Sequence, residues 1–182
     1  MTGERRMKQL IGIIGGRSQN TSEEACRLAE AIGAEIGQRG FGLICGGGDG
    51  IMEAACRGCK QADGITLGVL KWNHNQDANP YIDIAIPTSM DLARNNIIVW
   101  SACGVIALEG NYGTTSEISL ALDIEKPLIV VGDNFLLKEN VFETSNSCTR
   151  ILGNDSRNAG SILDTLLLMV KKDNPNKFAR HV

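Results

Sequence analysis

The sequence predicts a single-domain, Rossmann-like α/β fold: a doubly wound, mostly parallel sheet with helices on both faces. Short apolar runs alternate with segments of helical periodicity along most of the 182 residues, and glycine-rich turns follow several of the apolar runs. Strands that alternate with helices join through right-handed crossovers, which produce a parallel sheet covered on both sides. This length is typical of one domain, so residues 1–182 are expected to form it, with loose termini at 1–7 and 173–182.

The N-terminal elements are the clearest in the pattern. A continuous apolar run, LIGII at 10–14, predicts a central strand. Thr21 and Glu24 have the spacing of a capping box, so Thr21 is expected to start a helix that ends at Gly40. A second strand is predicted at 41–45. The buried face of the helix is expected to consist of Ala25, Leu28, Ala29, Ile32 and Ile36.

The later elements continue the alternation. The further predicted strands are 65–70, 81–86, 104–108, 127–131 and, from a weaker signal, 149–152. The further predicted helices follow the glycine turn at 46–50 and cover 89–100, 114–125 and about 158–172. Pro87 is expected to stop the strand before it, and Pro127 to be the first residue of its strand, where a missing N–H matters least. The segment 71–80 is polar and irregular.

Composition narrows the choice of partners. A net charge of −3 gives no general attraction to nucleic acid or to an anionic membrane. No apolar run reaches the length of about 20 residues that a membrane-spanning helix requires. The first ten residues, MTGERRMKQL, lack the apolar stretch of a secretion signal. We therefore expect a cytoplasmic protein that binds neither nucleic acid nor membrane.

The six cysteines do not indicate a metal or disulfide framework. Cys56 and Cys59 form a C-x-x-C pair, which is compatible with redox chemistry or a metal. A zinc site would need a second such pair, which the sequence lacks, and this pair falls near a helix end rather than at a helix start. Cys45 and Cys103 lie in or beside predicted strands, where a free cysteine is commonly a small buried apolar residue. We predict no metal site.

Two glycine-rich turns at predicted strand ends are the candidate ligand site. The first is 46–50 and the second is 110–114. Ligands of open α/β sheets bind at the carboxyl ends of the strands. Glycines let backbone N–H groups approach an anion, and the N-terminus of the following helix favours negative charge. Since neither turn has the dinucleotide or the Walker spacing, we expect another kind of phosphorylated small molecule.

Three motifs resemble one known family. They are GGGDGIMEAACRGCKQADG at 46–64, ARNNI at 93–97 and GNYGTTSE at 110–117. Together they are similar to the LOG-like superfamily of Rossmann-type nucleotide-binding proteins, formerly called lysine decarboxylase-like, and the resemblance covers about 8–172. Within the superfamily, the first two motifs are most similar to the molybdenum cofactor carrier proteins. Better-known members are phosphoribohydrolases that release cytokinin bases from nucleoside 5′-monophosphates.

The resemblance implies roles for particular residues. In the hydrolases, the residue corresponding to Glu117 assists N-glycosidic cleavage, and the one corresponding to Arg94 holds the nucleotide. A carboxylate can stabilise the positive charge that develops on the ribose, and the arginine fork suits phosphate oxygens. The full set of candidate binding residues is Gly15, Gly16, Arg17, Gly46, Gly47, Gly48, Arg94, Asn95, Gly110, Asn111, Tyr112, Gly113, Thr114, Thr115 and Glu117.

The chain departs from the hydrolase pattern P-G-G-x-G-T-x-x-E at two positions. Glu109 replaces the proline and Asn111 replaces the second glycine. A carboxylate at about 5 Å from a bound anion would cost about 3 kcal/mol at an effective dielectric constant of 20. Glu109 therefore points away from the site, or pairs with a cation such as Arg94, or the ligand differs from a simple nucleoside monophosphate.

Several of the candidate residues also have a purely structural interpretation. Glu117 and Thr114 have capping-box spacing, so Glu117 is also explained as a helix cap. Arg94 fits an ordinary solvated position on its helix, and Arg17 fits either the crevice or the surface. The first glycine turn is also explained as a tight turn into a helix capped by Asp49.

These observations leave more than one function open. The first hypothesis is a protein that binds a phosphorylated, nucleotide-like or pterin-like small molecule, with molybdenum cofactor as the named candidate. The alternative is a nucleoside 5′-monophosphate phosphoribohydrolase in which Glu117 and Arg94 are catalytic, and a sensor that uses the same pocket is a third. The resemblance further implies a homodimer or homotetramer.

Overall fold

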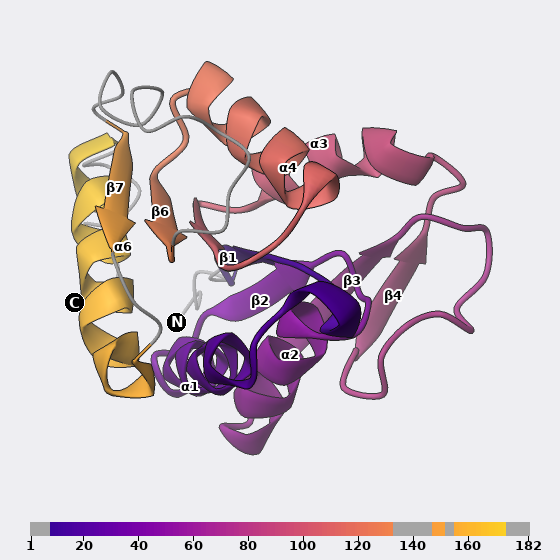
Figure 1. Cartoon of the computed structure of the whole chain (residues 1–182), viewed down its shortest axis with the longest axis horizontal. Coiled ribbons are helices and arrows are strands. Elements are labelled where there is room, and N and C mark those ends of the chain that lie inside the picture. Colours follow the sequence, from indigo (N-terminus) through magenta and orange to yellow (C-terminus); the bar gives the residue numbers. More distant parts are fainter. Residues whose placement is uncertain (1–7, 133–146, 152–154, 174–182) are drawn as a thin grey trace, which may run out of the picture.

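Seven parallel strands form a single sheet in the order β4-β3-β2-β1-β5-β6-β7 (Figure 1). The computed structural model describes residues 8–132, 147–151 and 155–173. The strands are β1 (Leu10–Ile14), β2 (Gly42–Cys45), β3 (Ile65–Leu70), β4 (Ile84–Pro87), β5 (Gly104–Ala107), β6 (Leu128–Val131) and β7 (Cys148–Ile151). The fold is the Rossmann-like α/β architecture that the sequence predicts.

Helices cover both faces of the sheet. On one face lie α1 (Glu23–Gln38), α2 (Ile51–Gln61) and α6 (Ala159–Asp173), and on the other lie α3 (Asn95–Ser101) and α4 (Tyr112–Asp123) (Figure 1). Successive residues of a strand face opposite sides, so Ile13 packs in the core under α1 and Ile14 in the core under α3. The apolar runs of the sequence are therefore central strands buried on both faces.

The chain reverses its direction across the sheet beside β1. It winds from β1 through β2 and β3 to β4 at one edge, and then returns to place β5 on the other side of β1. The connections that leave the carboxyl ends of β1 and β5 therefore diverge. In this architecture, ligands bind at the carboxyl ends of the strands near such a reversal.

Helix α1 begins one residue later than the capping box predicts. Ser22 is the N-cap, and its Oγ accepts a hydrogen bond of 3.1 Å from the N–H of Ala25. Thr21 is extended, and its hydroxyl instead donates to the carbonyl of Arg17 at 3.3 Å. The predicted role of Thr21 with Glu24 is therefore wrong, because Ser22 supplies the same hydroxyl chemistry one position on.

The predicted single helix at 89–100 is also wrong. A 3-10 turn, η2 (Asp91–Arg94), precedes α3, and Ser89 and Asp91 have φ values of 56° and 46°. These left-handed conformations are incompatible with a continuous helix through this segment. The break places Arg94 at the junction of η2 and α3.

The remaining differences concern element ends. The strand predicted at 81–86 is β4, which starts later and includes Pro87, tolerated because β4 is an edge strand. Helix α4 begins at Tyr112, two residues before its predicted start, and Asp173 belongs to α6 rather than to a loose tail. Leu152, predicted to end β7, lies outside the described residues, as do 1–7 and the residues after 173. Among the helices that are described, none combines the length and apolarity needed to cross a bilayer.

Two glycines let α1 and α2 pack in direct backbone contact. A Cβ atom at Gly33 of α1 would overlap the carbonyl of Ala55, and one at Gly58 of α2 would overlap the carbonyl of Glu30. Beside this contact, Arg57 donates to both carboxylate oxygens of Glu30, at 3.0 and 2.8 Å. The two helices therefore form one rigid layer below the carboxyl ends of β1 and β2.

The substitution Gly58→Ala should destabilise the protein because the new methyl group has no space between the helices. We expect the free energy of unfolding to fall by about 2 kcal/mol or more, measured by urea denaturation. Gly160→Ala in α6 is the matched control, since its Cβ would meet side-chain atoms only at 3.6 Å or beyond. Equal stabilities of the two variants would contradict the close packing of α1 and α2.

Candidate functional site

A buried ion pair joins the segment before α3 to α4. The Nη1 of Arg94 donates to Oε1 of Glu117 at 3.0 Å and to Oδ1 of Asn95 at 2.6 Å. Each side chain of the ion pair is only 8% exposed. The Nε of Arg94 is buried and has no hydrogen-bond partner in the described part of the chain. The guanidinium therefore keeps an unused donor in a buried position.

Burial dominates the ionisation of Glu117. It raises the pKa of the carboxyl group to about 7, although the nearby charges of Arg94 and, more weakly, Lys71 oppose this shift. The pKa thus lies close to neutral pH. A carboxyl group of this kind can both donate and accept a proton at physiological pH.

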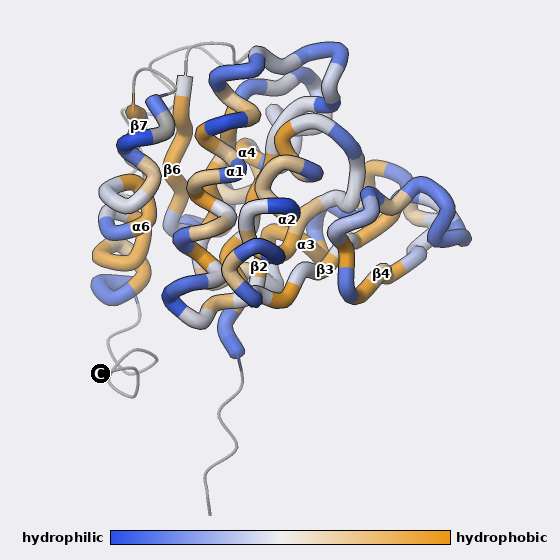
Figure 2. Tube along the Cα trace, turned by 90° about the horizontal axis from the view of Figure 1, so that it is seen from below, coloured by the Kyte–Doolittle hydropathy of each residue, from blue (hydrophilic) through white to orange (hydrophobic). Residues whose placement is uncertain are grey.

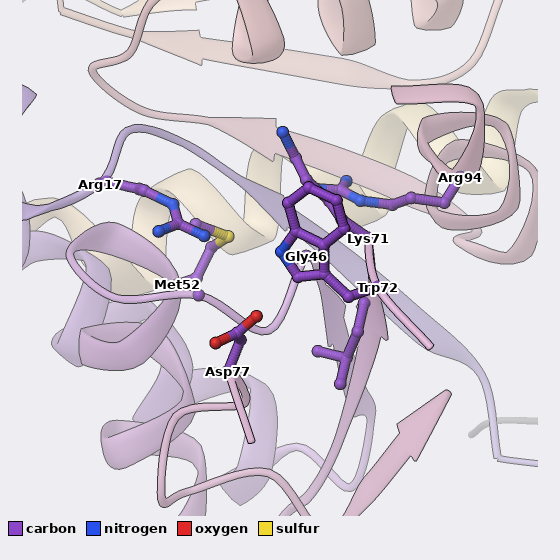
Figure 3. A pocket seen from close by; sticks show the side chains of 9 residues that line it. Arg17, Gly46, Met52, Lys71, Trp72, Asp77 and Arg94 are labelled. Carbon is purple, nitrogen blue, oxygen red and sulfur yellow. The ribbon is translucent and has the colours of Figure 1, made fainter. Parts of the chain in front are cut away.

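Arg94 also forms part of the wall of a pocket above the carboxyl ends of β1, β2 and β3 (Figure 3). The pocket is open to solvent, and the space in it that is not filled by atoms is about 350 Å³, which includes part of the open solvent at its mouth. It is lined by Arg17, Gly46, Gly48, Met52, Leu70, Lys71, Trp72, Asp77 and Arg94. Three of these residues are cations and one is a carboxylate, so the lining favours an anion.

The other two cations have weak partners. Arg17 lies 3.7 Å from a carboxylate oxygen of Asp49, and Lys71 lies 3.4 Å from one of Asp91. Arg17 and Asp49 are 58% and 43% exposed, and Asp91 is 66% exposed. Solvated pairs of this type contribute little, about 0–1 kcal/mol, so both cations remain available to a ligand.

The first glycine turn forms the floor of the pocket. A Cβ atom at Gly46 would lie 2.7 Å from Nη2 of Arg94, and one at Gly48 would lie 3.0 Å from the terminal methyl group of Met52. Glycine is thus required for the close approach of Arg94. Gly50 is the N-cap of α2 with φ 68°, and the Asp49 carboxylate accepts from Ser18 Oγ at 2.8 Å instead of capping the helix. The interpretation of this turn as a helix start capped by Asp49 is wrong.

The second glycine turn packs against the first strand. The N–H of Gly16 donates to the carbonyl of Glu109 at 2.5 Å, and Gly110 lies against the buried side chain of Thr114. Tyr112 is 81% exposed. None of these residues belongs to the lining of the pocket at β2.

The candidate residues of the sequence therefore fall into two groups. Arg17, Gly46, Gly48 and Arg94 line the pocket, and Asn95 and Glu117 are bonded to Arg94. Gly47, with φ 74°, lies in the same turn against Leu70. The second group, beside the carboxyl ends of β1 and β5, consists of Gly15, Gly16, Gly110, Asn111, Tyr112, Gly113, Thr114 and Thr115.

The structural alternatives for Arg94 and Glu117 are wrong. Arg94 is buried and not solvated. Helix α4 begins at Tyr112, so Glu117 lies beyond the first turn and bonds to Arg94 rather than to the helix start. The unpredicted start of α4 is what moves Glu117 away from the capping position.

Glu109, the unexpected acidic residue, faces away from Arg94. Its two carboxylate oxygens accept hydrogen bonds from the N–H and the Oγ of Ser22, at 2.7 and 3.0 Å. The carboxylate thus lies at the N-terminus of α1, where negative charge is favourable. Of the three alternatives for Glu109, the first is the one observed.

Sequence reasoning missed the wall contributed by the end of β3. Lys71 and Trp72 directly follow the last residue of β3, and Asp77 lies in the connection to β4. The signal was present, because a cation and an aromatic residue at the carboxyl end of a predicted strand obey the same rule as the glycine turns. The irregular composition of 71–80 concealed it.

The C-x-x-C residues do not face each other. Sγ of Cys56 lies 3.6 Å from Sγ of Cys45 in β2, whereas Cys59 contacts the carbonyl of Ile65 at 3.8 Å. Burial raises the pKa of the Cys59 thiol to about 11, which suppresses thiolate reactivity. The described residues contain no His, Cys, Asp and Glu cluster suited to a metal ion.

A parallel sheet with a cationic pocket at its carboxyl edge defines a Rossmann-like, small-molecule-binding class of protein. The chain belongs to the SLOG cluster4 family, whose model matches residues 8–159. The predicted membership of the LOG-like superfamily is confirmed.

The similarity to related proteins extends over most of the chain. An uncharacterized protein of Archaeoglobus fulgidus is 37% identical over 141 residues, which are 74% of this chain and 87% of the relative. The molybdenum cofactor binding protein of the phototrophic bacterium Rippkaea orientalis is 34% identical, with a TM-score of 0.77 over 88% of this chain and 98% of that one. The molybdenum cofactor carrier protein of Chlamydomonas reinhardtii is 29% identical, with a TM-score of 0.74 over 89% and 99%. These relatives support a small-molecule-binding role at the level of the family.

Glu117 should make the stability of the protein depend on pH. Its folded pKa of about 7 exceeds the ordinary value of 4.5, so between these values the folded protein holds more protons than the unfolded chain. The free energy of unfolding therefore decreases as the pH rises through this window. Relative to Glu117→Gln, we expect it to fall by on the order of 3 kcal/mol from pH 4 to pH 8, measured by urea denaturation.

Glu24→Gln is the control, because Glu24 is an exposed glutamate on α1. The difference between the unaltered protein and Glu117→Gln should change more over this pH range than the difference between the unaltered protein and Glu24→Gln. Equal changes for the two variants would show that Glu117 is not the buried, high-pKa group described above.

Proposed function

We propose that the protein binds a phosphorylated small molecule, nucleotide-like or pterin-like, in the pocket above β1, β2 and β3. The observation that carries this proposal is the buried guanidinium of Arg94. Its Nη1 is fixed by Glu117, its Nη2 lies against Gly46, and its Nε has no partner in the described chain. A buried donor without a partner is energetically unfavourable until a ligand acceptor reaches it.

The charges around Arg94 favour phosphate as that acceptor. Arg17 and Lys71 line the same pocket from β1 and β3, and Figure 3 shows Arg17 and Arg94 extending toward it from opposite sides. The planar fork of arginine binds phosphate oxygens through charge-assisted hydrogen bonds. The phosphoryl group therefore fits best between Arg17 and Arg94, above Gly46.

The rest of the pocket suits a flat ring. Trp72 is 50% exposed and stands over the pocket opening, and Leu70 and Met52 add apolar surface. Exposed aromatic faces stack on heterocycles, and the bound ring covers apolar surface. We assign the phosphate to the cationic end and the ring to Trp72.

Molybdenum cofactor is the specific ligand that we propose, as a carried molecule. It combines a phosphate with a pterin ring, so the two ends of the pocket match its two parts. Relatives with 34% and 29% identity are described as binding or carrying this cofactor. The turn at 110–115 remains part of the proposed site, because it opens the helix that holds Glu117 against Arg94.

A phosphoribohydrolase is the second candidate, and one observation favours it. The pKa of Glu117 is about 7 and its carboxyl group is bonded to Arg94, which suits an acid–base group beside a phosphate site. Glu117 does not, however, line the pocket, and a catalytic carboxylate must reach the ribose. We therefore favour a binding function over hydrolysis.

Replacing Arg17 tests the binding proposal. Arg17→Met should weaken the affinity for adenosine 5′-monophosphate about tenfold, because one charge-assisted phosphate contact is lost. The affinity is read from tryptophan fluorescence in a Trp100→Phe background, where Trp72 is the single remaining tryptophan. Arg27→Met is the matched control, since Arg27 is 60% exposed and pairs with Glu23 on α1.

The same samples separate binding from hydrolysis. Saturable quenching of Trp72 fluorescence without release of free base or ribose 5-phosphate supports a binding protein. Steady turnover that disappears in Glu117→Gln would instead establish the hydrolase. Equal affinities of Arg17→Met and Arg27→Met would contradict the phosphate position.

We also propose that copies of the chain associate through the edge strand β4. Ile84 and Ile86 are 44% and 37% exposed on one face of this strand, and Figure 2 shows apolar residues reaching the edge of the sheet there. Unpaired edge strands with apolar side chains commonly pair with another chain.

Ile86→Lys should therefore lower the mass of the particle in light scattering, whereas Leu168→Lys, at an exposed position on α6, should not. A monomeric unaltered protein would contradict this interface.

A further inference from the structure

We propose that Asn79, which belongs to neither glycine turn, is a positioning residue for the anion site. It turns the backbone N–H groups of Gly48 and Asp49 toward the pocket, so that these amides bind the phosphoryl group together with Arg94. The inference rests on the proposed phosphate site and names the residue that prepares its backbone part. Asn79 thereby links the β3–β4 connection to the glycine turn after β2.

Asn79 holds the glycine turn through several hydrogen bonds. Its side-chain Nδ2 donates to the carbonyls of Gly47 and Gly48, at 3.2 and 2.9 Å, and its backbone N–H donates to the carbonyl of Gly47 at 2.8 Å. Its Oδ1 accepts from the N–H of Tyr81 at 3.1 Å. The residue is 7% exposed, and both hydrogens of its amide group are used. An aspartate or an aliphatic residue could not make this set of bonds.

These hydrogen bonds fix the orientation of the backbone N–H groups of Gly48 and Asp49. In a trans peptide the N–H lies opposite the carbonyl of the same plane. The carbonyl of Gly47 shares a plane with the N–H of Gly48, and the carbonyl of Gly48 shares one with the N–H of Asp49. Because both carbonyls are directed at Asn79, both N–H groups are directed away from it. Successive amides arranged in this way form an anion-binding concavity.

Independent observations place a ligand on that side of the turn. Neither the N–H of Gly48 nor that of Asp49 donates a hydrogen bond to any residue that the structure describes. A Cβ atom at Gly48 would lie 3.7 Å from two guanidinium nitrogens of Arg17, so this glycine faces the cationic wall. The unpartnered Nε of Arg94, whose side chain is more than nine-tenths buried, belongs to the same pocket. The two free amides and the buried donor thus serve one acceptor.

Inorganic phosphate is the probe that tests this proposal, followed by amide chemical shifts in ¹⁵N-labelled protein. In the unaltered protein, phosphate should move the resonances of Gly48 and Asp49 more than those of the turn at 110–115. In Asn79→Ala these two shifts should be lost, and phosphate should bind about tenfold more weakly. Asn96→Ala is the matched control, because Asn96 donates to the carbonyl of Ala93 at 3.2 Å from an exposed position.

The outcomes separate the two proposals. No phosphate binding to the unaltered protein would overturn the proposed function. Equal phosphate affinity in folded Asn79→Ala and Asn96→Ala would overturn the role of Asn79 and leave the proposed function standing. If Asn79→Ala fails to fold, the unaltered protein alone still tests the role of Asn79. Phosphate-induced changes in amide chemical shift that are confined to residues other than Gly48 and Asp49 would also overturn that role.

Discussion

The buried contact between Arg94 and Glu117 is the interaction on which the site depends. It joins α4 to the start of α3 and holds the guanidinium against Gly46, so three segments that are distant in the sequence share one charged centre. Burying two charges is expensive, and such pairs contribute little net stability compared with apolar residues. The pair is therefore better explained by what it presents to the pocket than by the stability of the fold. The high pKa of Glu117 is the measurable sign of that burial.

The acidic residues of the two glycine turns do not line the pocket. Glu109 accepts hydrogen bonds from Ser22, and Asp49 accepts one from Ser18. Each carboxylate thus meets a hydroxyl group outside the lining, which leaves Asp77 as the only carboxylate among the described residues that line the pocket. The chain departs from the hydrolase motif at Glu109 without losing the cationic character of the site.

The sequence predicted the sheet well because its central strands are continuous apolar runs, as strands buried on both faces of a parallel sheet require. It predicted Arg17 and Gly46 because ligands of this architecture bind at the carboxyl ends of strands, and it predicted Arg94 through the family resemblance of the motif at 93–97. It failed at the start of α1, because Thr21 and Ser22 are both good N-cap residues. It also failed at 89–100, because nothing in the periodicity of this segment indicates the left-handed conformation of Ser89. The sequence also could not show which glycine turn is open, since that depends on packing between distant segments.

The wall of the pocket that carries Trp72 lies on a connection without regular structure, whereas Arg94 and Gly46 are bound to the core. The exposed residues 72–77 of this connection meet few packing constraints, whereas Asn79 is anchored to the glycine turn and Tyr81 and Ile82 pack against the core. Homologues that share the sheet and the cationic end are thus free to diverge in the small molecules that they bind. Residues 72–77 are accordingly the place to look for inherited differences in ligand preference, and exchanging them is a direct route to redesigning it.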